Sequence, residues 1–318
     1  MKVLITTTSF QDNPGRHHEM LAAQGYEIVR GRGPLDESRM LELVEGINGM
    51  ICGDDEITRA VILKALPSMK VISKYGIGLD RIDLDAATEL KVPVCFTPGV
   101  NDVTVAEHVF GLMICLARNI TQENELVKSG RWKRLAGREL HGKTLGIMGL
   151  GRIGRQVAMR AKAFGMRVLA YDIHWDERFA SEWKIEKCPA PHELLNRCDV
   201  LTLHMNLTPE NRNFLNRETL ALMKPSAFII NCARGQLVSS ADLAEALRNK
   251  KIAGYAADVL EKEPPDPDDP LLRLDNAIFT PHIGSRTFES VERQAAMAAE
   301  NLIRVLSGAE PLAQANRL

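Results

Sequence analysis

The feature that most constrains this chain is a glycine-rich turn between two short apolar runs. Residues 144–148 (TLGIM) predict a buried strand, and glycines follow it at Gly149, Gly151 and Gly154. A helical pattern comes next, and then a second apolar run that ends in Asp172. The glycine spacing alone would also suit a structural turn. The full order of strand, glycines, helix, strand and acid is typical of a Rossmann unit that binds a dinucleotide.

Each glycine in this unit has a physical role. Gly149 permits the sharp turn, Gly151 lets the backbone approach a diphosphate, and Gly154 lets helix and strand pack closely. The diphosphate would accept hydrogen bonds from the N–H groups of Arg152 and Ile153, at the positive end of the helix.

The acid at the end of the second strand predicts which dinucleotide binds. Asp172 would accept hydrogen bonds from both hydroxyls of the adenosine ribose and would repel a 2′-phosphate. The sequence therefore predicts NAD, rather than NADP, as the cofactor.

Composition sets broad limits on the remaining possibilities. The chain has 318 residues and a formal net charge of -1, which favours two domains and indicates neither a nucleic-acid nor a membrane partner. The N-terminal apolar run is too short for a signal peptide, and the most apolar segment, VTVAEHVFGLMICLARNI, falls short of a membrane span. The six cysteines show no metal-type spacing, so we expect no metal site, reduced thiols and a cytoplasmic location.

Strand-like and helix-like segments alternate on both sides of a long helix that begins at Asn101. Such alternation predicts parallel sheets with helices on both faces. The last helix, expected over residues 290–306, follows the completed nucleotide unit and would return to the first domain. The expected fold class is α/β with two doubly wound parallel-sheet domains. A Rossmann NAD-binding domain at 101–285 would be inserted in a flavodoxin-like substrate domain built from 1–100 and 286–318.

Three chemically active side chains follow predicted strands of the second domain: Arg234, Glu263 and His282. Ligands of doubly wound folds bind beyond the carboxyl ends of the strands, so these side chains should converge on the cofactor. Taken singly, each has an ordinary structural alternative. Arg234 could form a surface ion pair, Glu263 could be one acid of a solvated acidic loop, and His282 could be a structural histidine.

Together, the three side chains suit hydride transfer to a 2-oxo acid. An arginine can fix the substrate carboxylate and polarise the carbonyl group with its planar fork. A histidine can supply a proton to the developing alkoxide, and a neighbouring carboxylate stabilises the charged imidazole and orients its ring.

Motifs along nearly the whole chain resemble those of the D-isomer-specific 2-hydroxyacid dehydrogenase family, which includes phosphoglycerate, glyoxylate/hydroxypyruvate and D-lactate dehydrogenases. They are KYGIGLDRID, TPGVNDVTVAEH, GLGRIGRQVA, LHMNLTPENRNFLN, INCARGQLV, AADVLEKEPP and TPHIGS. The resemblance implies that Arg234, Glu263 and His282 are catalytic. It also implies that backbone amides of Tyr75, Gly76, Ile77 and Gly78 hold the substrate carboxylate. Further cofactor contacts that it implies are Thr104, Arg152, Ile153, Asp172, His204, Met205, Cys232, Ala233, Asp258 and Ser285.

The resemblance further implies a homodimer formed through the helix that begins at Asn101, although that helix could equally lie between domains. Asn206 and Gln236 depart from the commonest family pattern, which leaves the substrate open. Asp54 and Asp55 follow a strand of the first domain, and either would disfavour a substrate with a second anionic group if it lined the pocket. Both could equally face solvent. Because the chain ends at Leu318, we expect no appended regulatory domain.

Two other functions remain open at this stage. A dehydrogenase of a small anion such as phosphite would share the architecture, whereas formate is disfavoured because Glu263 keeps the hydroxyacid pattern. An NAD-sensing scaffold that resembles the C-terminal-binding-protein corepressors would share even the catalytic residues. A turnover assay with small 2-oxo acids would separate an enzyme from a scaffold.

Overall fold

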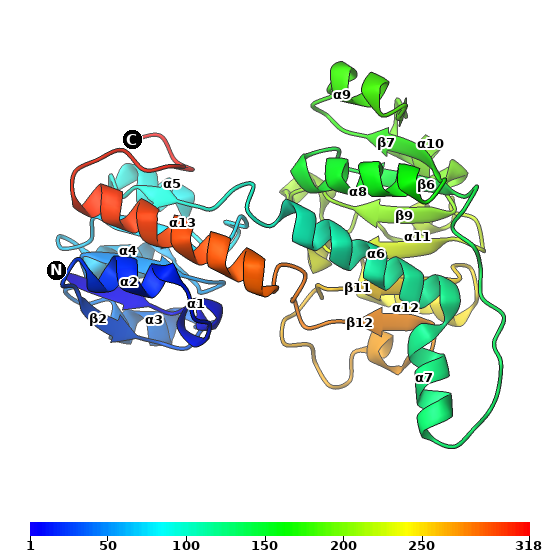
Figure 1. Cartoon of the computed structure of the whole chain (residues 1–318), viewed down its shortest axis with the longest axis horizontal. Helices are drawn as coiled ribbons and strands as arrows, with labels where there is room; N and C mark the ends of the chain where they lie inside the picture. Colours follow the sequence, from blue (N-terminus) through cyan, green and yellow to red (C-terminus); the bar gives the residue numbers. More distant parts are fainter. The chain divides into compact units, whose positions relative to one another are not determined.

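The computed structural model describes residues 1–318 in full, and the chain divides into two units (Figure 1). Met1–Asn101 and Ser285–Leu318 form the first unit, and Asp102–Gly284 forms the second. No single helix is long and apolar enough to cross a membrane. Two successive helices, Asp102–Arg118 and Ile120–Lys128, would pass on length and composition only if taken together, and they are bent by 63° at their junction.

The first unit is a five-stranded parallel sheet in the order β2-β1-β3-β4-β5. This is the strand order of the flavodoxin-like fold. Its strands are β1 (Lys2–Ile5), β2 (Glu27–Arg30), β3 (Gly49–Cys52), β4 (Val71–Lys74) and β5 (Val94–Cys95). Its helices are α1 (Thr8–Asp12), α2 (Arg16–Ala22), α3 (Glu37–Leu43), α4 (Arg59–Ala65), α5 (Leu84–Glu89) and α13 (Phe288–Leu306).

Apolar side chains alternate between the two faces of this sheet, so each face has its own core. Helices α3, α4 and α5 pack on one face, and α1, α2 and α13 pack on the other. Helix α13 is fixed there by alanines that allow close approach and by the fully buried Leu302. Ser73 donates a hydrogen bond of 2.8 Å to the carbonyl of Ala298, and Asn301 donates one of 3.0 Å to the carbonyl of Phe96. The last long helix therefore belongs to the first unit.

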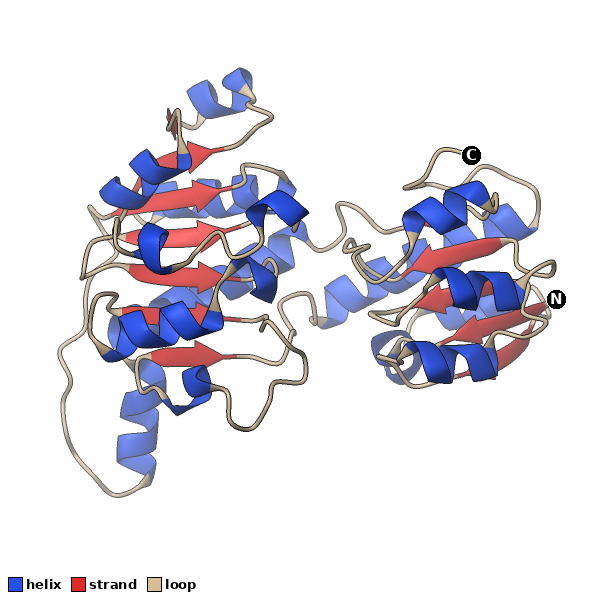
Figure 2. Cartoon of the chain, turned by 180° about the vertical axis from the view of Figure 1, so that it is seen from behind, coloured by secondary structure: helices blue, strands red, loops and turns tan.

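The second unit is a seven-stranded parallel sheet in the order β12-β11-β10-β9-β6-β7-β8 (Figure 2). Counted from β6, the order is that of a Rossmann sheet with one strand added at an edge. Its strands are β6 (Thr144–Met148), β7 (Arg167–Tyr171), β8 (Glu186–Lys187), β9 (Val200–Leu203), β10 (Phe228–Asn231), β11 (Gly254–Ala257) and β12 (Ala277–Phe279). Its α-helices are α6 (Asp102–Arg118), α7 (Ile120–Lys128), α8 (Arg152–Ala163), α9 (Glu177–Glu182), α10 (Pro191–Arg197), α11 (Arg217–Leu220) and α12 (Ser240–Arg248).

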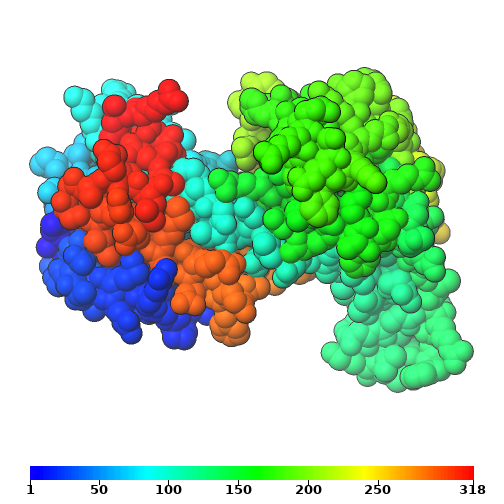
Figure 3. All heavy atoms as spheres, turned by 45° about the horizontal axis from the view of Figure 1, so that its top comes forward, coloured from blue at the N-terminus to red at the C-terminus, as the bar shows by residue number.

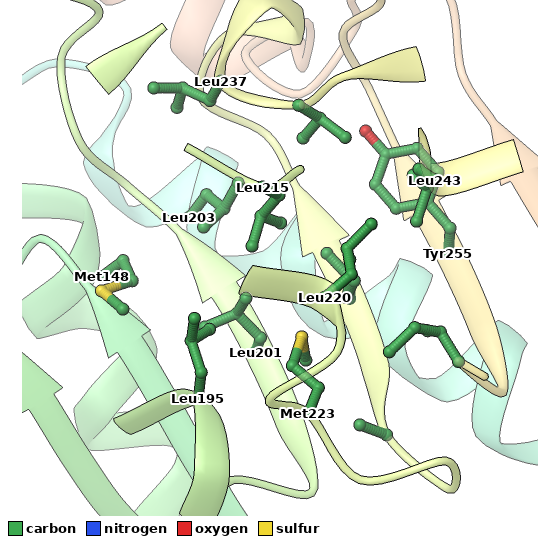
Figure 4. Close-up of a cluster of buried hydrophobic side chains, with 14 of the residues drawn as sticks. Met148, Leu195, Leu201, Leu203, Leu215, Leu220, Met223, Leu237, Leu243 and Tyr255 are labelled. Carbon is green, nitrogen blue, oxygen red and sulfur yellow. The ribbon is translucent and has the colours of Figure 1, made fainter. Parts of the chain in front are cut away.

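Two apolar clusters enclose this second sheet. Helices α10, α11 and α12 cover one face, where Met148, Leu201 and Leu203 meet Leu195 and Leu243 (Figure 4). Helices α6, α8 and α9 cover the other face. With helices on both faces, ligands can reach the sheet at the carboxyl ends of its strands.

The predicted fold class, two doubly wound parallel-sheet α/β domains, is confirmed by this topology. The differences from expectation are local. Helix α8 begins at Arg152, so Gly154 lies within its first turn, and a short helix, α1, follows β1. Helix α7 was not predicted, and none of its residues is buried. A helix without a buried face carries no apolar periodicity for sequence reasoning to detect.

Candidate active site

The glycine-rich turn after β6 has the geometry that its sequence predicts. Gly149 has a φ of 96°, and a Cβ there would lie 2.7 Å from the carbonyl oxygen of His204. A Cβ at Gly154 would lie 2.1 Å from the Gly149 oxygen, so only glycine permits this approach of helix and strand. A Cβ at Gly151 would meet no atom within 4 Å. The space beside the first turn of α8 is therefore open, and that opening fits a diphosphate.

Asp172, just after β7, ties this turn to the neighbouring strand. Its carboxylate accepts hydrogen bonds from the N–H of Leu150 at 2.6 Å and the N–H of His174 at 2.7 Å. Each carboxylate oxygen can accept a second hydrogen bond, so both could also accept from ribose hydroxyls. The predicted contact of Asp172 with the adenosine ribose remains a proposal.

The other predicted cofactor contacts of the second unit lie at the start of α6 or after successive strands of the sheet. Thr104 is buried on α6. Burial lowers the pKa of His204 to about 3, so this histidine is neutral, and its Nε2 lies 2.9 Å from the Thr202 hydroxyl. Burial raises the pKa of the Cys232 thiol, which argues against a nucleophilic role. Met205, Ala233 and Asp258 follow β9, β10 and β11, whereas Ser285 falls in the first unit.

His282 and Glu263 form a direct pair in the second unit. Nδ1 of His282 lies 2.7 Å from Oε2 of Glu263, and about two-fifths of each side chain is exposed. Oε1 of Glu263 accepts a hydrogen bond of 3.0 Å from the N–H of Leu260, which fixes the carboxylate. Because Nδ1 contacts Glu263, Nε2 is the ring nitrogen that we propose exchanges a proton with a ligand.

Arg234 lies on a segment that packs against the loop of Glu263. The next residue is Gly235, where a Cβ would lie 2.0 Å from the carbonyl of Leu260, so glycine is required for the contact. Buried Asn231 shapes the turn, because its amide donates to the Arg234 carbonyl at 2.9 Å and accepts from the Ala233 N–H at 3.0 Å. The guanidinium donates to the Ala233 carbonyl at 2.7 Å. The structure thus brings the Arg234 segment and the Glu263 loop together.

Two residues that sequence reasoning did not assign complete this arrangement. His108, on α6, places its Nε2 2.9 Å from the hydroxyl of Thr280 and 3.4 Å from Oδ1 of Asp258. The Thr280 hydroxyl donates to Asp258 at 2.5 Å, so it accepts the hydrogen from His108 Nε2. The available signal was that a histidine stands in a largely apolar helix.

Asp258 links this network to the catalytic candidates. Its buried carboxylate accepts from the N–H groups of Ile283 and Gly284 at 2.8 and 2.7 Å, and its carbonyl accepts from the N–H of His282 at 2.9 Å. Burial alone would raise the pKa of Asp258, but hydrogen bonds from His108, Thr280 and these two amides lower it below its ordinary value. Asp258 is therefore ionised and holds the turn that carries His282.

The predicted carboxylate-binding loop, residues 75–78, lies in the first unit after β4. The N–H of Tyr75 donates to the carbonyl of Cys52 at 2.9 Å, and the N–H of Gly76 donates to the hydroxyl of Thr97 at 2.9 Å. Those two amides are therefore engaged within the unit. No hydrogen bond within the unit uses the N–H of Ile77 or Gly78, which leaves these two amides as the candidate anion donors.

Comparisons with known proteins support these observations. A family model for the NAD-binding domain of D-isomer specific 2-hydroxyacid dehydrogenases matches residues 110–284, which confirms NAD as the predicted cofactor. Glyoxylate reductase of Pyrococcus furiosus is 36% identical over an alignment of 325 residues. The alignment covers 99% of this chain and 95% of that protein. D-3-phosphoglycerate dehydrogenase of Methanocaldococcus jannaschii is 44% identical over 285 residues, but the chain spans only 53% of its length.

Solved structures with the same fold lead to the same family. A protein of Thermus thermophilus superposes with a TM-score of 0.90 at 39% identity, covering 99% of both chains. D-lactate dehydrogenase of Aquifex aeolicus, determined with NAD and lactic acid, superposes with a TM-score of 0.85 at 29% identity, covering 97% of this chain and 96% of that one.

Proposed function

Because the chain belongs to the D-isomer specific 2-hydroxyacid dehydrogenase family, we propose that it interconverts a 2-oxo acid and a D-2-hydroxy acid by NAD-dependent hydride transfer. The observation that carries this proposal is the 2.7 Å pair of His282 and Glu263 at the carboxyl edge of the Rossmann sheet. The predicted family and the predicted class, an NAD-dependent oxidoreductase, are confirmed by the family model and the relatives. The roles of individual residues are part of the proposal.

The residues around the glycine-rich turn fit the cofactor. The N–H groups of Arg152 and Ile153 would hold its diphosphate, and Asp172 would hold its adenosine ribose. When bound, the cofactor supplies or accepts the hydride. The tasks left to the chain are to orient the 2-oxo acid and to move one proton.

Arg234, His282 and Glu263 divide these tasks. The planar guanidinium of Arg234 binds the substrate carboxylate and polarises the carbonyl group. Nε2 of His282 donates a proton to the forming hydroxyl during reduction and removes it during oxidation. Glu263 holds Nδ1, so it fixes the ring and favours the protonated imidazole that reduction requires. The amides of Ile77 and Gly78 add a second anchor for the carboxylate.

We also propose a cytoplasmic homodimer. All six cysteines are free thiols, as expected in a reducing compartment. Helix α7 has no buried residue although it carries apolar side chains, so it offers a surface to a second copy.

Turnover with small 2-oxo acids tests the proposed function. NADH oxidation should be followed with glyoxylate, hydroxypyruvate, pyruvate, phosphohydroxypyruvate and bulkier 2-oxo acids. At least one of them should be reduced to the D-hydroxy acid. NADH binding without turnover of any of these acids would favour a scaffold or another anion as substrate and would contradict the proposal.

Substitutions then test the residue roles. We expect His282→Ala to lower kcat by about a hundredfold or more, with NADH affinity nearly unchanged, because the proton donor is lost. The exposed His192 provides a matched control, and His192→Ala should keep full activity. Arg234→Lys keeps the charge but loses the fork, so KM should rise as kcat falls. Full activity of His282→Ala would show that His282 is not the proton donor.

A further inference from the structure

Lys74 is a buried lysine that directly precedes the loop of residues 75–78. Only 4% of its side chain is exposed, at the carboxyl end of β4. Its ammonium donates to the carbonyl of Gly53 and to Oδ1 of Asp54, each at 2.6 Å. The side chain of Asp54, in contrast, is 60% exposed. The pair therefore combines a buried positive charge with a negative charge in contact with water.

The loop is built over this lysine. Gly76 has a φ of 127°, and a Cβ there would lie 3.5 Å from Cε of Lys74. A buried ammonium needs a compensating charge, and Asp54 provides one. The loop that offers the amides of Ile77 and Gly78 to an anion consequently has the exposed carboxylate of Asp54 at the neighbouring strand end.

The adjacent acid, Asp55, has a different role. Its carboxylate is fully buried and accepts hydrogen bonds from the Thr6 hydroxyl, from the N–H of Leu35 at 2.8 Å and from the N–H of Gly53 at 2.9 Å. These contacts join the ends of β1 and β3 to the loop after β2. Asp55 is thus a structural acid, and Asp54 supplies the exposed charge.

We propose that the Asp54–Lys74 pair is a specificity element that disfavours substrates with a second anionic group. The preferred substrates are then 2-oxo acids with a single negative charge and an uncharged substituent, such as glyoxylate or hydroxypyruvate. This inference rests on the proposed function.

The matched pair of hydroxypyruvate and phosphohydroxypyruvate isolates the second charge. The wild-type protein should show a higher kcat/KM for hydroxypyruvate. Asp54→Asn removes the exposed charge and releases the Lys74 ammonium from its carboxylate. We expect the ratio of kcat/KM for phosphohydroxypyruvate to that for hydroxypyruvate to rise about tenfold in this variant. The control variant is Glu89→Gln. It breaks a similar exposed ion pair, between Glu89 on α5 and Arg59 on α4, and should leave the ratio unchanged.

A second measurement needs no variant. Salt screens repulsion between exposed charges, so the same ratio in the wild-type protein should rise with ionic strength. A ratio that falls with salt, a wild-type preference for phosphohydroxypyruvate, or an Asp54→Asn ratio within twofold of wild type would overturn the inference. Each of these outcomes requires turnover of a 2-oxo acid. They therefore differ from failure of the proposed function, in which no 2-oxo acid is reduced.

Discussion

His282 adopts a left-handed backbone conformation, with a φ of 54°, that is uncommon for residues other than glycine. Such a conformation costs about 1–3 kcal/mol and persists where the surroundings fix it. Here Asp258 fixes it, because its carbonyl binds the His282 N–H and its carboxylate binds the next two N–H groups. This left-handed conformation sets the position of the residue that we propose to move the proton.

The pair of Glu263 and His282 predicts a change in pH dependence. Reduction of a 2-oxo acid needs protonated His282, and the Glu263 carboxylate stabilises that form. Activity of the wild-type protein should therefore fall as pH rises, and in Glu263→Gln the fall should begin at lower pH. The measurement is the pH profile of kcat/KM for NADH-dependent reduction. Profiles that overlay would show that the carboxylate only positions the ring.

Asp172 predicts the choice of cofactor. We expect the catalytic efficiency with NADH to exceed that with NADPH by at least tenfold, because a carboxylate repels the added phosphate. Asp172→Ala should narrow this difference. It should also loosen the turn, since Asp172 binds the N–H groups of Leu150 and His174. Equal efficiency with both cofactors in the wild-type protein would exclude Asp172 from this role.

At the scale of residues, the sequence predicted best the positions of side chains that directly follow a strand. His282 and Glu263 could be expected at one edge because parallel strands end together. The exposure of Asp54 and the burial of Asp55 could not be predicted, since adjacent loop residues share the same local pattern. The burial of Asp55 depends on Thr6 and Leu35, which are distant in sequence.

At the scale of elements, α6 is tied to the loop after β12 through His108, Thr280 and Asp258. We therefore expect His108 to be a positioning residue for the His282 turn. His108→Leu should lower kcat about tenfold with little change in substrate KM, whereas His108→Gln, which keeps an N–H donor, should retain most activity. Equal losses in both variants would show that the donor is irrelevant and that only packing matters.

The same network predicts the acid stability of the second unit. Hydrogen bonds lower the pKa of Asp258 against the effect of burial, so its ionised form stabilises the fold. That contribution is complete above the unfolded pKa of about 4 and is lost as pH falls through the lower folded pKa. Removal of one donor in His108→Leu should reduce the free energy of unfolding by about 1–2 kcal/mol at pH 7, and by less near pH 3. Denaturation by urea at both pH values measures the difference.

Among the elements, the sequence pattern predicted β6, the helical pattern of α8, and the long helices α6 and α13. It could not predict α7, because none of its residues is buried. The contribution of His108 on α6 to the site could not be predicted either, because its partner Thr280 follows a strand far along the chain.

At the scale of the whole molecule, the apolar surface of the monomer leads to a prediction about assembly. Much of α6, which we expected to form a dimer interface, is buried in the core of its own unit. Helix α7 and the segment after it project from the second unit instead (Figures 1 and 3). There, Ile120, Val127 and Trp132 are 45%, 53% and 79% exposed.

Exposed apolar side chains on a projecting arm are typical of surfaces that a second subunit covers. We therefore expect sedimentation velocity at micromolar concentration to give the mass of a homodimer. Val127→Asp combined with Trp132→Asp should shift the protein to a monomer, because a charge buried without a partner in an apolar contact is costly. Leu63→Asp, at an exposed leucine of α4 in the first unit, is the matched control and should leave the dimer intact. A wild-type monomer under these conditions would contradict the prediction, and a dimer unaffected by the double substitution would place the interface elsewhere.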